Sequence, residues 1–158
     1  MATVYDDRKE IYFEDLEIGD GFISLARTVT EADLVNFAAF LGWYDPLHCD
    51  AVSSEQGLFG TRVSQGLLGL ALSNGLCRGC FPSGRGRVAP LAFLETHWRF
   101  KRPIRIGDTV HVEQEVLEKR ETQKPDQGIV VFKVALLNQE NQVVQEGEKT
   151  FLVKRRPR

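Results

Sequence analysis

Residues 65–81, QGLLGLALSNGLCRGCF, form an apolar stretch that decides how the rest of the chain is interpreted. Apolar residues fall on nearly every side of a helix drawn through it, which is typical of a helix enclosed by a sheet. Gly66, Gly69 and Gly75 each lower helix propensity by roughly 1 kcal/mol, so a neighbouring group must come close enough to reward their small size. The stretch therefore predicts a buried central helix.

Downstream of this stretch the hydrophobic pattern changes to a period of two. A loop rich in glycine and proline, residues 81–90, comes first, and the later alternation predicts successive strands. Four meandering antiparallel strands behind one buried helix predict a layered α+β domain. The predicted strands are LAFLETHWRF (91–100), DTVHVEQEVLEKRE (108–121), GIVVFKVALLNQ (128–139) and QVVQEGEKTFLVKRR (142–156).

Upstream of the stretch, a strand and an amphipathic helix are expected. FISLART, residues 22–28, follows a Gly-Asp-Gly turn signal and alternates as a strand does. Thr30 stands as an N-cap with Asp33 three residues on, and apolar residues then recur at helical spacing. This pattern predicts a helix over 31–41 that Gly42 ends, and one helical turn near 52–56.

The length and composition of the chain limit the kinds of protein that it can be. The chain has 158 residues, which fit a single domain over 1–158 with its core at about 12–156, and the basic end KRRPR is expected to be a frayed tail. The formal charge of −2 argues against nucleic acid as a partner. The polar start, the three cysteines without framework spacing and the lack of any run near the roughly 20 apolar residues of a membrane span predict a cytoplasmic protein without a membrane partner.

The loop LGWYDPLHCD, residues 41–50, places two acids around one histidine. A histidine beside a carboxylate suits acid–base catalysis, yet Asp followed by Pro is also common in plain turns. We assign Asp50 to capping the turn that follows it. His48 and Asp45 are left as candidates for a catalytic pair.

Six segments follow one another along the chain: YFEDLEIGDGF, VTEADLVNFAAFLG, DPLHCD, FGTRVSQGLLGLAL, RFKRPIRIGDTVHVEQEV and NQVVQEGEKTFLVKRR. In this order they resemble segments of MaoC-like dehydratases, the group that includes the R-specific enoyl-CoA hydratases. The resemblance runs from about Tyr12 to Arg156 and implies a hot-dog fold, in which an antiparallel sheet wraps a long helix, and pairing of two domains into a homodimer or higher homo-oligomer. It also implies addition of water to a trans-2-enoyl thioester of CoA or acyl carrier protein, or the reverse dehydration.

The resemblance implies a catalytic Asp–His pair in the pattern Gly-Asp-x-Asn-Pro-x-His. Gly42, Pro46 and His48 match this pattern, but Trp43 occupies the Asp position and Asp45 the Asn position. Asp45 has either taken over the role of the missing carboxylate, or the carboxylate is lost and Trp43 fills its volume. Because one positioned acid–base group is worth about 10²- to 10⁴-fold in rate, the two alternatives differ in activity.

The rest of the implied site lies on the central helix and around it. Where relatives begin this helix with His-Gly, the chain has Gln65-Gly66, so the Gly66 amide, joined by that of Leu67, is expected to hold the thioester oxygen. Asn74 stands where many relatives have a serine facing the pair, and is expected to orient Asp45 or the water. The basic residues expected to bind the phosphates of CoA are Arg85, Arg87, Lys101 and Arg102.

No metal or cofactor is expected besides the CoA thioester substrate, because the pair Cys77 and Cys80 has no second cysteine pair to complete a zinc site.

Two other functions are compared with that of a hydratase. The alternative to the hydratase is a binding protein of the same fold, or a subunit that completes a partner's site. Thioester hydrolysis is disfavoured because it would use a carboxylate on the central helix, and residues 65–77 contain none.

Overall fold

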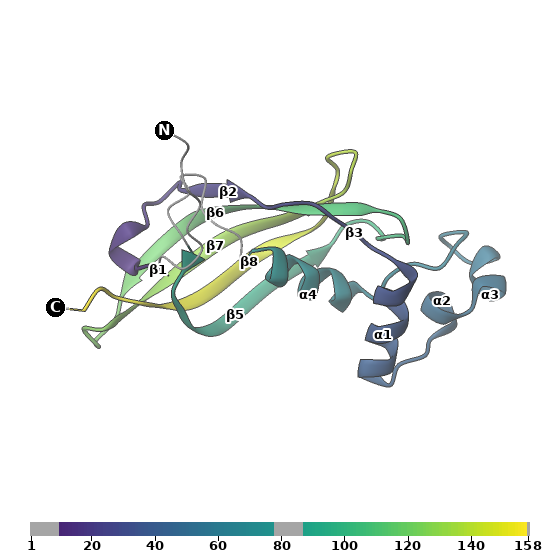
Figure 1. Cartoon of the computed structure of the whole chain (residues 1–158), viewed down its shortest axis with the longest axis horizontal. Helices are drawn as coiled ribbons and strands as arrows, with labels where there is room; N and C mark the ends of the chain where they lie inside the picture. The colour runs from purple at the N-terminus through teal and green to yellow at the C-terminus, as the bar shows by residue number, and fades with distance from the viewer. Residues whose placement is uncertain (1–9, 78–86, 158) are drawn as a thin grey trace.

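The computed structural model describes residues 10–77 and 87–157. A long antiparallel sheet forms one body, and short helices extend beyond one end of it (Figure 1). The elements in chain order are β1 (Glu10–Ile11), η1 (Phe13–Asp15), β2 (Gly21–Ile23), β3 (Arg27–Thr28), α1 (Glu31–Leu41), α2 (Pro46–Cys49), α3 (Ala51–Glu55), α4 (Gly66–Leu76), β4 (Arg87–Val88), β5 (Pro90–Phe100), β6 (Thr109–Glu121), β7 (Gln127–Leu137) and β8 (Val143–Lys154).

The sheet confirms the predicted strands but not their order. Its strands lie in the order β2-β6-β7-β8-β5, all antiparallel, with β3 also paired to β6. The simple meander is wrong for β5, which pairs with β8 rather than with β6. Alternation in the sequence identifies a strand and its buried face, but not its neighbour. Strand β4, in a segment predicted to be a loop, pairs in parallel with β1.

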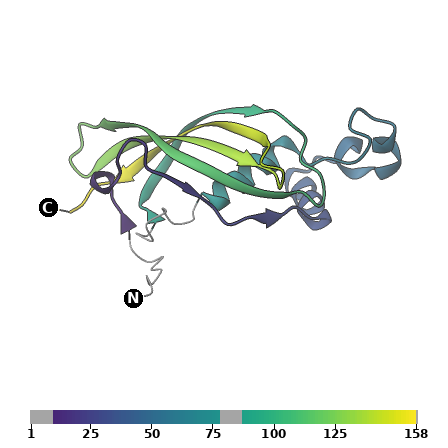
Figure 2. The same ribbon diagram turned by 90° about the horizontal axis from the view of Figure 1, so that it is seen from above.

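Helix α4 lies across one face of the sheet (Figures 1 and 2). Leu68, Gly69 and Ser73 are buried, whereas Leu67 is 49% exposed. The predicted central helix is therefore buried along its sheet side, while apolar residues such as Leu67 stay exposed, because a single sheet contacts a helix along one stripe. The core between the sheet and its helices is formed mainly by Leu16, Leu34, Leu68, Val110, Val112, Val130, Val134, Leu136 and Val153.

Close contacts with the sheet explain the small size of two glycines in α4. A Cβ on Gly69 would lie 2.2 Å from the Gln145 Nε2 atom, and one on Gly66 would lie 3.0 Å from the Phe100 ring. Strands β8 and β5 therefore reach the helix at these two positions. A Cβ on Gly75 would meet nothing within 4 Å, so this glycine has no such packing reason.

Helix α1 forms over the predicted residues because its signals are local. Thr30 and Asp33 form the capping box, and Gly42 ends the helix with a φ of 66°, in the left-handed region that glycine adopts without a steric penalty. The predicted turn near 52–56 is found as α3. The stretch 22–28 divides into two short strands, β2 and β3, instead of forming one.

The basic C-terminal segment is anchored rather than frayed. The Arg155 Nε atom donates to Glu14 Oε1 at 2.6 Å, and Arg155 also pairs with Glu121. Arg156 pairs with Asp15. The prediction of a frayed tail is wrong because these acids, distant in the sequence, lie beside the end of β8 in the fold.

None of the helices in the described ranges has the length and apolar character needed to cross a membrane.

Candidate functional site

His48 lies on the short helix α2 and is 6% exposed. Its Nδ1 atom is 2.7 Å from the Val63 carbonyl oxygen. Because a carbonyl only accepts hydrogen bonds, Nδ1 must carry the proton, which leaves a lone pair on Nε2 in the neutral ring. Within 10–77 and 87–157, Nε2 has no hydrogen-bond partner. The ring is thus held in the tautomer that can take a proton from a ligand.

Two consecutive caps build the backbone around His48. The Asp45 carboxylate accepts from the Leu47 amide at 2.9 Å and caps α2, with Pro46 at the first helical position. The Asp50 carboxylate accepts from the Ser53 amide at 3.0 Å and caps α3, as predicted. Asp45 therefore has a structural role, and its Oδ2 atom has no hydrogen-bond partner among the described residues.

Trp43 packs against His48. The two rings meet edge to face with centroids 5.4 Å apart, and the indole is 48% exposed. Such aromatic contacts stabilise a ring in one orientation. The tryptophan at the family's Asp position thus contributes packing at the histidine and offers no carboxylate.

A cavity of about 290 Å³ joins His48 to the start of α4. The predicted site residues His48, Gly66, Lys101 and Arg102 all line it. Asp45 and Asn74 are not among its lining residues. The remaining lining residues are Leu47, Phe59, Val63, Ser64, Phe100, Pro103, Ile104 and Gln145.

The first turn of α4 presents amide donors at this cavity. The Leu68 amide donates to the Gln65 carbonyl at 3.0 Å, whereas the amides of Gly66 and Leu67 donate to no backbone carbonyl in the part of the chain that the structure describes. Free amides and the positive end of the helix dipole favour a developing negative charge. Gln65 itself is buried, and its Oε1 atom has no hydrogen-bond partner in those same ranges.

Two exposed cations lie at the edge of the cavity. The Lys101 Nζ atom is 2.8 Å from Glu146 Oε1, and this hydrogen bond lowers the pKa of the glutamate. The Arg102 guanidinium donates to the Val143 carbonyl at 2.7 Å, which leaves its other N–H groups for an anion. Arg85 lies outside the described residues. Arg87 belongs to β4, beside Val88, which lines a different cavity.

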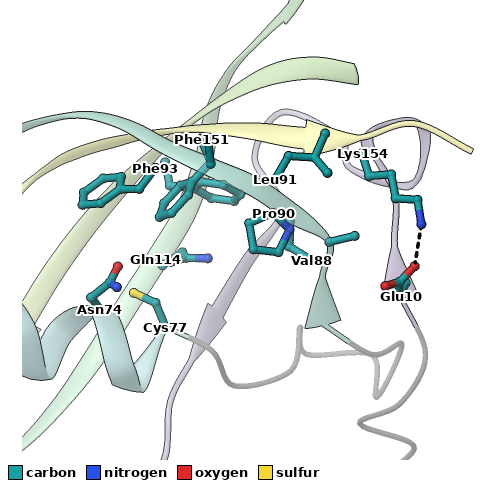
Figure 3. Close-up of a pocket in the computed structure, with 13 residues that line it drawn as sticks. Glu10, Asn74, Cys77, Val88, Pro90, Leu91, Phe93, Gln114, Phe151 and Lys154 are labelled. Atoms are coloured by element: carbon teal, nitrogen blue, oxygen red, sulfur yellow. Dashed lines mark ion pairs between the residues drawn. The ribbon is translucent and has the colours of Figure 1, made fainter. Parts of the chain in front are cut away.

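Asn74 lines that second cavity, at the other end of α4 (Figure 3). This cavity measures about 580 Å³ and is walled largely by aromatic and aliphatic side chains of β5 and β8, including the stacked pair Phe93 and Phe151, whose centroids are 4.8 Å apart. Cys77 lines it too, and burial raises the pKa of its thiol to about 11, so the thiol is protonated at neutral pH. The structure does not bring Asn74 and His48 into one cavity.

Sequence reasoning missed two polar residues near the site, Trp98 on β5 and Gln145 on β8. Gln145 lines the His48 cavity, is 2% exposed and bonds both to Trp98 and to the Gly66 carbonyl. A polar residue in the alternating pattern of a strand, on the face that turns toward the helix, was the available signal. No group of three or more His, Cys, Asp or Glu side chains suited to a metal ion occurs in 10–77 or 87–157.

A family model described as "MaoC like domain" matches residues 16–136. The (R)-specific enoyl-CoA hydratase of Rhodospirillum rubrum is 30% identical over 148 residues, which cover 94% of this chain and 95% of that protein. The 3-hydroxybutyryl-CoA dehydratase of Methylorubrum extorquens is 35% identical over 108 residues, 68% of this chain and 65% of that one. Protein MaoC of Klebsiella aerogenes is 34% identical over 101 residues, and the match covers 64% of this chain but only 29% of that protein.

Solved structures agree with the predicted fold. The monoamine oxidase regulatory protein from Archaeoglobus fulgius superposes with a TM-score of 0.84 at 31% identity, covering 96% of this chain and 99% of that one. A Mycobacterium tuberculosis protein described as a double hotdog fold superposes with a TM-score of 0.77 at 19% identity, covering 94% of this chain and 45% of that one. The α+β hot-dog fold predicted from the sequence is thereby confirmed.

Proposed function

Because this chain belongs to the MaoC-like dehydratase family, we propose that it adds water to a trans-2-enoyl thioester of CoA or acyl carrier protein, or removes it from the 3-hydroxyacyl thioester. One observation carries the proposal. The His48 ring, with Nε2 unpartnered among the described residues, lines the same cavity as Gly66, at the free amides of α4. A proton acceptor opposite an oxyanion site is what hydration of a conjugated thioester requires.

In the proposed reaction His48 acts as the general base. Its Nε2 atom takes a proton from water as the water oxygen bonds to C3 of the enoyl group. Electrons of the double bond move toward the thioester carbonyl, and the amides of Gly66 and Leu67 stabilise the resulting enolate oxygen. When the enolate collapses, the protonated His48 returns its proton to C2 and becomes neutral again, so the net change is the addition of one water.

Asp45 and the two cations complete this assignment. Asp45 lies outside the lining of the His48 cavity, and we assign its Oδ2 atom, which the α2 cap does not use, to hold the attacking water from the far side of His48. Lys101 and Arg102 bind phosphate groups of CoA at the cavity edge, because guanidinium and ammonium groups form charge-assisted hydrogen bonds with phosphate.

A second candidate function is binding of the thioester without turnover. The observation that favours it is the loss of the usual carboxylate: Trp43 packs on the histidine, and Asp45 already caps α2 through one oxygen. With the histidine alone the rate would fall by about 10²- to 10⁴-fold. A chain of this kind would hold acyl-CoA or complete the site of a partner subunit.

The two candidates are separated by Asp45→Asn, with Asp50→Asn as its matched control. Asparagine caps a helix about as well as aspartate, so α2 and α3 should survive both changes. Loss of the conjugated thioester's absorbance measures hydration, and a bound fluorescent acyl-CoA measures affinity. The hydratase predicts that the wild type turns over, that Asp45→Asn is at least tenfold slower and that Asp50→Asn equals the wild type. A wild type that binds acyl-CoA but never hydrates it supports the second candidate and refutes the first.

We also propose that the chain forms a homodimer through the edge strand β5. This strand pairs only along its β8 side among the described strands, and Leu91, Phe93 and Leu94 on it are about half exposed. A long apolar edge strand invites pairing with another strand. Light scattering should give about twice the chain mass of 17.8 kDa for the wild type and for the control Leu25→Lys, and the chain mass for Leu94→Lys. A monomeric wild type would contradict this assignment.

A further inference from the structure

The buried amide of Gln145 connects the sheet to the first turn of α4. Its Nε2 atom donates to the Gly66 carbonyl at 3.1 Å, and its Oε1 atom accepts from the Trp98 indole at 2.8 Å. The indole N–H can only donate and a carbonyl can only accept, so these two partners permit one orientation of the amide. Both ends of the Gln145 side chain are therefore held.

The surrounding contacts leave this amide little freedom. Gln145 is 2% exposed and lies against the α4 backbone at Gly69, where a Cβ would come within 2.2 Å of its Nε2 atom. The Trp98 ring is held in turn, because the Lys149 ammonium lies 5.1 Å from its centroid. A side chain packed in this way transmits its position to the group that it binds.

The bond to the Gly66 carbonyl acts on the Leu67 amide. The carbonyl of Gly66 and the N–H of Leu67 belong to one planar trans peptide group and point in opposite directions. A donor on the carbonyl oxygen, added to the hydrogen bonding of this carbonyl within the helix, therefore helps to fix the direction of the Leu67 N–H, which points toward the N-terminal end of α4. Hydrogen bonding at the oxygen also polarises the peptide and strengthens its N–H as a donor.

We propose that Gln145 is a positioning residue for the oxyanion site, and that Trp98 orients it. This inference rests on the proposed hydratase function. Gln145 acts through the Gly66–Leu67 peptide and not through contact with the reacting atoms. Its effect belongs to the transition state, in which charge develops on the thioester oxygen, and not to binding of the neutral substrate.

Kinetics of Gln145→Met test the role in the reaction. Methionine keeps a side chain of similar length but forms neither hydrogen bond. The kcat should fall about tenfold to a hundredfold, at or below the range for loss of one oxyanion donor, while KM stays within roughly twofold. Trp98→Phe keeps the aromatic ring and removes only the indole donor, so kcat should fall about threefold to tenfold. The double variant should be no slower than Gln145→Met, since Trp98 acts through Gln145.

A matched control separates positioning from a general loss of stability. Val153→Ala truncates a fully buried residue of the same strand far from the cavity, and should lower the melting temperature without changing kcat. An unchanged kcat in Gln145→Met, or a loss confined to KM, would overturn the proposal. Val153→Ala losing as much kcat as Gln145→Met would overturn it too.

Backbone NMR tests the hold on the peptide without any substrate. The resonance of the Leu67 amide nitrogen should move upfield in Gln145→Met, because the Gly66 carbonyl loses a hydrogen-bond donor, with no comparable change in Val153→Ala. An unchanged Leu67 resonance would refute the positioning role whatever the activity. A wild type with no hydratase activity but with this difference in chemical shift would refute the proposed function and leave the structural hold of Gln145 established.

Discussion

The two ends of α4 border different kinds of space. The N-terminal end faces the smaller cavity, with an imidazole, free amides and two cations around it. The C-terminal end faces the larger cavity, whose walls include Phe93 and Phe151 (Figure 3) and also Phe132. A helix presents donors and positive potential only at its start, so polar chemistry gathers there. One helix therefore presents free amides to a small cavity at its start and borders a larger cavity, walled by aromatic side chains with polar groups among them, at its end.

A buried lysine lies between the two ends. Lys149 is fully buried, and its Nζ atom donates to Ser73 Oγ at 2.8 Å. Ser73 in turn donates to the Leu70 carbonyl, so the hydroxyl remains satisfied without the lysine. Burial lowers the pKa of Lys149, and a negative charge on the nearby Cys77 would oppose that shift.

The largest expected effect comes from removing the histidine at the N-terminal end. His48→Ala should lower kcat for enoyl-thioester hydration by about 10²- to 10⁴-fold, because the proton acceptor is lost. The matched control is His97→Ala, since His97 is exposed and its side chain bonds only to Glu95 among the described residues. Absorbance of the conjugated thioester measures both rates. Equal loss in the two variants would remove the distinction between the ends of α4.

A smaller effect is expected from adding a methyl group at two glycines of α4. Gly69→Ala should lower the free energy of unfolding by about 1–3 kcal/mol, because the new Cβ would clash with the hydrogen-bonded Gln145 amide. Gly75→Ala should raise it by about 0.5–1 kcal/mol, because alanine favours helix and the site is open. Urea unfolding measures both. A stabilising Gly69→Ala would mean that the contact with β8 is loose.

The smallest expected effect concerns Lys149. Lys149→Met should raise the free energy of unfolding by about 1 kcal/mol near pH 7, because an apolar side chain of similar length needs no compensation for a buried charge. In the wild type the unfolded state binds more protons between the lowered folded pKa and the ordinary lysine pKa of 10.5. Wild-type stability therefore rises with pH in that window relative to the variant.

Urea unfolding of both proteins at pH 7 and pH 10 checks this prediction. The advantage of Lys149→Met should shrink at the higher pH. The Cys77 thiol, whose folded pKa is raised to about 11 from an ordinary value of 9.0, lowers the stability of both proteins as pH rises through this range. A difference that stays constant with pH would indicate that burial does not shift the lysine.

A structural feature could be predicted where the residues that determine it are neighbours in the sequence. The capping box at Thr30 and the stop at Gly42 are formed by neighbouring residues, so α1 was predicted with its observed bounds. The position of β5 beside β8 depends on contacts across the whole sheet, and the alternating pattern carries no such information. Arg155 likewise found its acidic partners only through the fold.

The candidate site divides in the same way. His48 and Gly66 were named from motif positions, and Lys101 and Arg102 from their positive charge; all four line one cavity. Asn74 was also named from a motif position, yet eight residues of helix, about 12 Å, carry it to the other cavity. Gln145 was missed because its role depends on a bond to a backbone carbonyl of another element.

The sequence by itself determined the family, the α+β fold and the identity of the histidine, because periodicity, caps and motif order are written in neighbouring residues. Only the tertiary structure decided the tautomer of that histidine, the cavity in which each candidate lies, and the link from Trp98 through Gln145 to Gly66. These depend on which distant backbone and side-chain groups meet, and packing of the sheet against α4 brings them together.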